Sequence, residues 1–135
     1  MSEFINTIEV LGDEATMDAI IERTITEFRD DVLTSVGAYA FYGCAALETV
    51  DLPSITSIAA NAMANCSSLG AFILRGSTAV TLANTNGLAG SGVAKGTGYI
   101  YVPRALVDTY KAATNWSTYA NQIRAIEDYP DITGG

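Results

Sequence analysis

Histidine is absent from this chain, and cysteine occurs only twice in its 135 residues. A structural zinc site takes four nitrogen or sulfur ligands, so two cysteines without histidine cannot complete one. A catalytic cysteine also needs a base to activate its thiol, and histidine, the usual base, is missing. The residue inventory therefore excludes a zinc site of this type and a cysteine–histidine nucleophile.

Basic residues are scarce as well, with seven lysines and arginines against fifteen acidic residues and a net charge of −8. This charge has the wrong sign for the phosphates of nucleic acids and for anionic lipid surfaces. No apolar run approaches the roughly 20 residues that cross a bilayer. The first thirty residues lack the features of a secretory signal. We expect no nucleic acid partner, no membrane insertion and no export signal in this chain.

What the chain does contain is enough apolar material for one buried core. Hydrophobic residues make up 49% of the sequence, and the mean hydropathy is +0.23. This content suits a single domain of this length and argues against intrinsic disorder.

The middle of the chain repeats itself with an offset of 22 residues. The matching positions are Thr34 and Thr56, Phe41 and Met63, Cys44 and Cys66, Leu47 and Leu69, Val50 and Phe72, and Leu52 and Leu74. A period of about 22 residues falls within the range of leucine-rich repeats. In such repeats each coil adds one short strand and a returning turn or helix to a stack.

Two weaker copies flank the clear ones. A third copy begins near Val80, places Ser91 where the others have cysteine, and ends in a strand over residues 100–102. Its glycines between residues 87 and 98 predict an irregular loop in place of a returning helix. A further strand is expected around residues 24–28, in a register that the sequence leaves open.

The two ends of the chain have helical patterns. Residues 13–23 begin with Asp13, a capping residue, and predict an amphipathic helix after a short strand over residues 4–11. After Pro103, Leu106, Val107, Tyr110 and Ala113 fall on one helical face. A short second helix over Ser117, Tyr119, Ala120 and Ile123 would bring Trp116 against the last repeat.

These patterns predict an α/β solenoid, a short leucine-rich-repeat stack of about three to four coils with a helix covering each end. We expect a single domain over residues 1–135. Within it, residues 1–23 form an N-terminal strand and cap helix, 24–103 the repeats, 104–127 a C-terminal helical cap, and 128–135 a flexible tail.

The repeat motif resembles the BspA-like leucine-rich repeat of bacterial surface proteins and of phage or prophage structural proteins. The resemblance covers roughly residues 24–127. It is carried by the segment 36–47 with its echo, by Tyr101, Val102 and Pro103, by Tyr110 and Lys111, and by Asn115 and Trp116. The chain departs from the usual motif at Ala59, Met63 and Ser91. The resemblance implies a role in protein recognition or assembly, in a virion or at a cell surface.

Residues that suggest chemistry have simpler explanations. Cys44 and Cys66 occupy equivalent repeat positions and are expected to be buried thiols, although a disulfide between adjacent coils stays open. The acidic pairs at 30–31 and 127–128 lack the spacing of a calcium loop. The glycines around Lys95 lack the order of a phosphate-binding loop. We expect no catalytic residue, no cofactor and no metal.

Strand alternation suggests one contact face. If Val50, Phe72 and Ile100 point inward, the candidate protein-contact face consists of the outward residues Asp51, Ile73, Tyr99 and Tyr101. The alternative, that the caps or the tail cover this face, stays open.

The sequence thus favours a non-catalytic protein–protein recognition or assembly module, such as a virion component of a phage or prophage or an adhesin-like protein. Its partner would be an unidentified protein or a second copy of the chain. The alternatives are a cytoplasmic scaffold or an orphan repeat protein without a dedicated ligand and, least favoured, an enzyme. The location stays open among virion, cytoplasm and cell surface.

Overall fold

The computed structural model describes residues 26–133. The expected strand at residues 4–11 and the expected helix at residues 13–23 lie outside the described residues.

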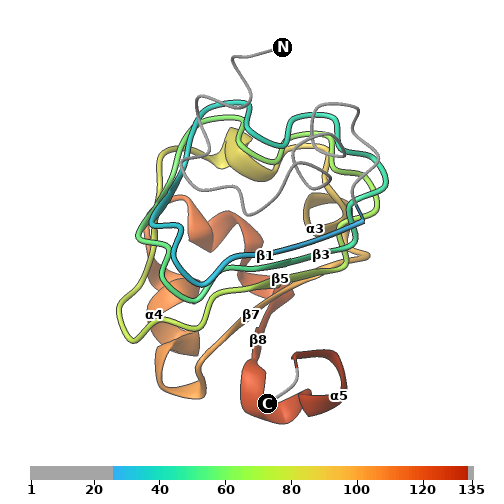
Figure 1. Ribbon diagram of the computed structural model, residues 1–135. Coiled ribbons are helices and arrows are strands. Elements are labelled where there is room, and N and C mark those ends of the chain that lie inside the picture. Colours follow the sequence, from blue (N-terminus) through green and yellow to red (C-terminus); the bar gives the residue numbers. More distant parts are fainter. Residues whose placement is uncertain (1–25, 134–135) are drawn as a thin grey trace.

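Two parallel sheets run along the described part of the chain. The first three described coils give one strand to each sheet, and the last two strands extend the larger sheet alone. The strands of the larger sheet lie side by side in Figure 1. The larger sheet has the order β1 (Glu27–Arg29), β3 (Thr49–Asp51), β5 (Ala71–Ile73), β7 (Tyr99–Val102) and β8 (Ile123–Ala125). The smaller sheet has the order β2 (Ser35–Val36), β4 (Ser57–Ile58) and β6 (Thr81–Leu82). This arrangement is solenoid-like, because each coil contributes one strand and the next coil lies beside it.

The 22-residue offset is the register between neighbouring coils. Phe28 pairs with Val50, and Val50 pairs with Phe72. Strand β1 therefore takes the place of the expected strand near residues 24–28, and its register is now known. Phe72 pairs with Ile100 and Ile100 with Ile123, so the ladder continues to the last strand. Ile123 lies in a strand, and the prediction that it belongs to a helix is wrong.

The main core is the ladder of inward side chains predicted from the alternation. Val50, Phe72 and Ile100 are fully buried and belong to one apolar cluster with Leu52 and Leu74. Burial of each such side chain contributes roughly 1.5–3 kcal/mol relative to an exposed position. Stacking supplies this burial, because a single coil leaves one side of its apolar row uncovered.

On the turn side of the coils, backbone hydrogen bonds join equivalent turns of neighbouring coils. Gly43, Asn65 and Gly90 have φ values of 72°, 62° and 72°. Glycine and asparagine tolerate this left-handed conformation better than other residues. The amide of Gly43 donates to the Ala64 carbonyl at 2.9 Å. Asn65 donates likewise to the next coil, and these bonds set the spacing of the turns.

The third coil contains two short helices where an irregular loop was expected. They are η1 (Thr85–Leu88) and α3 (Gly92–Lys95). The Ser91 side chain, at the place of the cysteines, accepts a hydrogen bond from the Ala94 amide and so caps α3. A Cβ on Gly92 would lie 2.1 Å from the Leu69 carbonyl oxygen, so only glycine fits this approach between coils. The glycines permit close packing here, and the prediction of a loop was wrong.

The chain after β7 folds against the end of the array (Figure 1). The elements are η2 (Arg104–Leu106), α4 (Val107–Ala112), η3 (Trp116–Gln122), β8, η4 (Ile126–Asp128) and α5 (Pro130–Thr133). Tyr110 and Trp116 are buried, and both bind the backbone of Val80. The Val80 amide donates to the Tyr110 hydroxyl at 2.8 Å, and the Trp116 indole N–H donates to the Val80 carbonyl at 2.7 Å.

No helix within residues 26–133 is long and apolar enough to span a membrane.

Candidate functional site

The four residues of the predicted contact face lie on adjacent strands. Asp51 of β3 is in register with Ile73 of β5, and Ile73 with Tyr101 of β7. Tyr99 pairs with Ala71 in the same way. They point away from the main core, as the alternation predicted. However, Ile73, Tyr101 and Asp51 are only 0%, 2% and 6% exposed, so the expectation of an accessible face is corrected.

The C-terminal segment, residues 126–133, covers this face. Ile126 packs with Ala71, Ile73 and Tyr101 in a second, smaller apolar cluster. The rings of Tyr101 and Tyr129 pack edge-on, with 5.4 Å between their centroids. Apolar side chains on both faces of a strand need cover on both sides, and this segment supplies it on the outer side. The prediction of a flexible tail is wrong for residues 128–133, since α5 packs here and Thr133 is 2% exposed.

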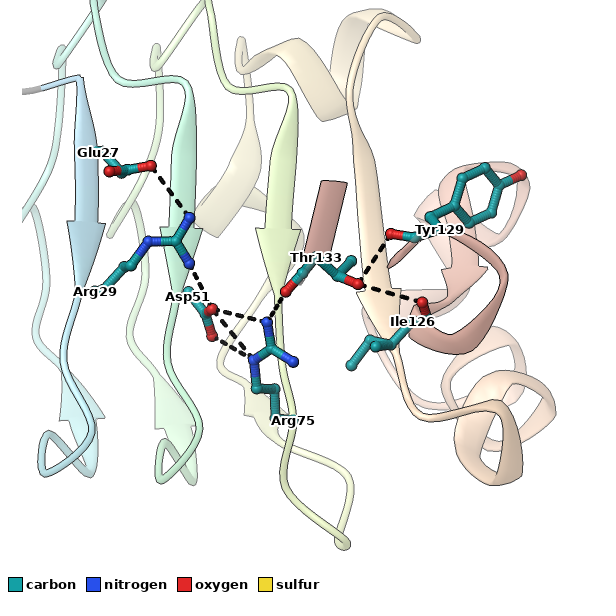
Figure 2. A network of polar contacts seen from close by, with 7 residues as sticks. All are labelled: Glu27, Arg29, Asp51, Arg75, Ile126, Tyr129 and Thr133. Atoms are coloured by element: carbon teal, nitrogen blue, oxygen red, sulfur yellow. Dashed lines mark hydrogen bonds and ion pairs between the residues drawn. The ribbon is translucent and has the colours of Figure 1, made fainter. Parts of the chain in front are cut away.

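A network of polar contacts centred on Asp51 runs along the same face (Figure 2). The Asp51 carboxylate accepts from Arg29 Nη1 at 2.7 Å and from Arg75 Nε and Nη2 at 2.9 and 3.0 Å. Arg29 also pairs with Glu27 at 3.1 Å. The Arg75 guanidinium donates in addition to the Thr133 carbonyl. One buried carboxylate thus joins three coils and, through Arg75, the C-terminal segment.

The Asp51 network has a structural role. Both carboxylate oxygens of Asp51 are taken up by arginine donors. Paired and hydrogen-bonded charge is the form in which ionised groups are normally buried. The Thr133 hydroxyl donates to the Tyr129 carbonyl at 3.0 Å, which closes the last turn of the segment. These contacts hold the segment over the apolar face.

The turn side of the first two clear repeats carries a group of exposed or partly exposed side chains, which we call the turn surface: Tyr39, Tyr42, Asn61 and Asn65. Asn61 Nδ2 donates to the Tyr39 hydroxyl at 3.1 Å, and Asn65 Nδ2 donates to the Tyr42 hydroxyl at 3.0 Å. The centroids of the two tyrosine rings lie 5.3 Å apart. The Tyr39 side of this group is open to solvent, with 48% of the residue exposed.

Sequence reasoning missed the turn surface, although a signal was present. Tyr39 and Asn61 are 22 residues apart, and so are Gly43 and Asn65. Exchange of glycine and asparagine at equivalent positions is typical of a left-handed turn. Such turns lie at a surface and repeat in every coil, so side chains next to them stack into a column.

The two cysteines are buried and form no disulfide. The Cys66 thiol donates to the Phe41 carbonyl at 3.0 Å. Burial, together with a smaller contribution from the neighbouring Cys44, raises the pKa of Cys66 to about 12. A thiol that stays protonated and covered is a poor nucleophile. Among the described residues, no group of three or more histidine, cysteine, aspartate or glutamate side chains is placed to hold a metal ion.

Stacked parallel strands, one per coil, define this chain as a solenoid repeat protein. A comparison with protein-family models matches residues 4–86 to the BspA type leucine rich repeat region, in six copies. The match covers more than half of the chain, and the protein belongs to the BspA-type leucine-rich repeat family. No curated protein and no solved structure matches it significantly. Repeats of this type are found in surface proteins and in proteins that bind other proteins.

Proposed function

We propose that this protein is a non-catalytic recognition or assembly module that binds a protein partner through the turn surface. The observation that carries the proposal is the tyrosine pair at that surface, with Tyr39 48% exposed and its hydroxyl held by Asn61. Tyrosine and asparagine are favoured in recognition surfaces, because a rigid ring gives contact area at a small cost in conformational entropy.

The turn surface is organised before any partner arrives. Tyr39 has a φ of 62°, a conformation that costs energy for a bulky side chain. Each asparagine amide donates to the hydroxyl oxygen of a tyrosine, and this hydrogen bond holds the ring in place. A ring that is already held in place loses little freedom on binding, which favours affinity.

Chemistry elsewhere in the described chain supports a non-catalytic role. The most buried carboxylate, that of Asp51, is engaged by two arginines. Both cysteine thiols are covered. In this proposal residues 104–127 serve as the C-terminal cap of a stack of about three to four coils. The resemblance to bacterial surface and phage structural repeats favours a virion component or an adhesin-like protein.

The test compares three forms of the protein: wild type, Tyr39→Ala with Tyr42→Ala, and Tyr129→Ala. Tyr129 is the matched control, because its exposure of 36% is similar but it lies on the C-terminal segment. Light scattering measures self-association, and affinity capture from the source cells measures binding of other proteins. Thermal unfolding checks that each variant is folded.

We expect self-association or capture of a discrete protein by wild type and by Tyr129→Ala, and its loss in the double variant. A folded double variant that associates as wild type does would refute the proposed surface. A wild-type protein that is monomeric and captures nothing would instead favour an orphan repeat protein without a dedicated ligand.

A further inference from the structure

A half-open depression of about 420 Å³ lies between the third coil and η3. One wall comes from η1 and α3, with Asn86, Val93 and Ala94, and the other from η3, with Thr118 and Asn121. This volume falls within the range of small-molecule sites, roughly 300–1,000 Å³. None of the four turn-surface residues lines the depression, although Asn65 adjoins Gly90 at its edge, so the inference goes beyond the function proposed above.

The depression is preformed. Gly90 at its edge has a φ of +72°, and a Cβ there would lie 2.3 Å from Asn65 Oδ1, so no side chain fills the opening. Tyr119 is tied by its hydroxyl to the Thr85 carbonyl at 2.6 Å. Gln122 is tied by its amide to the Gly98 carbonyl at 2.9 Å. Fixed walls reduce the entropy that a ligand would lose on binding.

None of the ten residues that line the depression is charged, although the chain has a net charge of −8. A second depression of about 370 Å³ beside α4 is different, since Arg104, Lys111, Arg124, Asp108 and Asp128 line it. Its charges are partly paired with each other, through Arg104 and Asp128. The first depression therefore offers nothing to balance an ion and disfavours charged ligands.

The hydrogen-bonding groups of the first depression suit hydroxyl groups. The side chains of Asn86, Thr118 and Asn121 make no hydrogen bond within residues 26–133, and they lie around the opening. An amide offers donors and an acceptor together, and a threonine hydroxyl does the same. A ligand with adjacent hydroxyls can use both at once.

The remaining lining is apolar. Ala89 and Ala94 are its accessible apolar groups, and they lie beside the nearly buried side chains of Val93 and Tyr119. A sugar ring combines hydroxyls at its edge with a face of C–H groups, and an aromatic or aliphatic wall accommodates that face. We propose that this depression binds an uncharged carbohydrate.

The probe for the test is an array of immobilised neutral and acidic glycans. Wild type is compared with Asn86→Ala/Asn121→Ala, which removes two amides, and with Ala94→Arg, which fills the depression. Ala112→Arg on α4 is the control for added charge and size, since Ala112 is exposed and lies outside the lining. Thermal unfolding confirms the fold of every form.

We expect wild type and Ala112→Arg to bind neutral glycans, and the other two variants to lose affinity by at least about tenfold. Lost binding in a folded Ala94→Arg protein would support the site even if the double variant were unstable. Binding to acidic glycans alone, binding to no glycan, or neutral binding unchanged in both lining variants would overturn the proposal. None of these outcomes depends on the tyrosines of the turn surface, so the two proposals succeed or fail separately.

Discussion

Truncation of Trp116 to alanine is expected to lower the free energy of unfolding by about 4–6 kcal/mol. Trp116 is 1% exposed and lies at the end of the inward ladder. Its ring packs edge-on against the ring of Tyr110, with 5.2 Å between the ring centroids. The centroid of the Phe72 ring lies 6.4 Å away. The substitution would therefore open a cavity between the last coil and the helical segment that follows it.

Two contributions add up to this magnitude. Removal of a large buried aromatic ring costs roughly 3–5 kcal/mol. The Val80 carbonyl, which accepts from the indole N–H at 2.7 Å, would also lose its partner, for about 1 kcal/mol more. Trp116→Phe separates the two terms, because it keeps most of the ring and removes the donor. We expect a loss of about 2 kcal/mol for that variant.

The assay is urea unfolding of wild type, both Trp116 variants and Ser117→Ala. Ser117 is the adjacent exposed residue, and its change should stay within about 0.5 kcal/mol. In thermal unfolding, Trp116→Ala should lower the midpoint by roughly 16–24 °C, at about 4 °C per kcal/mol for a chain of this size. A loss below about 1 kcal/mol for Trp116→Ala would refute the packing described for residues 104–122.

Three further predictions concern the polar network, the glycine contacts and the thiols. Asp51→Ala should lower the free energy of unfolding, measured with urea, by about 2–3 kcal/mol, because Arg75 loses its carboxylate partner. The same change should speed proteolysis of residues 126–133. The control Glu27→Ala, at an exposed residue, should cost under about 0.5 kcal/mol. Equal losses would contradict a role for Asp51 in holding the segment. Gly92→Ala should lower the free energy of unfolding by more than about 2 kcal/mol. The control Gly76→Ala should be nearly neutral, because a Cβ there would meet nothing closer than 3.5 Å. A neutral Gly92→Ala would show that the coils can separate to make room for the methyl group. The pKa of Cys66 is about 12 in the folded protein, against an ordinary value of 9.0 for a cysteine thiol. Between pH 9 and 12 unfolding therefore releases this proton, and the free energy of unfolding should fall as the pH rises through that range. A Cys66→Ala variant should show a smaller fall, and rapid thiol labelling of the native protein at pH 8 would contradict the burial of both cysteines.

The sequence alone determined the repeat and its inward ladder. The 22-residue offset between Val50 and Phe72 is a register of parallel pairing, because neighbouring coils place equivalent residues side by side. The alternation of apolar positions then determined which side chains enter the main core. The equivalent positions of Cys44 and Cys66 likewise indicated burial, since a residue type repeated in the ladder faces the same interior.

Other features depend on contacts between distant segments that have no common period. The helical pattern predicted near Ile123 gave way to strand β8, because pairing with Ile100 satisfies the backbone and extends the sheet. The 22-residue spacing of Tyr39 and Asn61 was a signal for the turn surface, but the uncharged depression could not be recognised from residue types, since it depends on the positions of several segments at once.

The candidate contact face is the clearest case in which the sequence alone could not decide the structure. Strand alternation placed Ile73 and Tyr101 correctly on the outer side of the sheet, and the same pattern would fit an exposed or a covered face. Only the tertiary structure decided between them. The C-terminal segment has no repeat pattern, and its position depends on the Arg75 contact with Thr133 and on the packing of Ile126 against strands of earlier coils. Apolar side chains are buried by whichever segment reaches them, and the hydrophobic effect does not specify which segment that is.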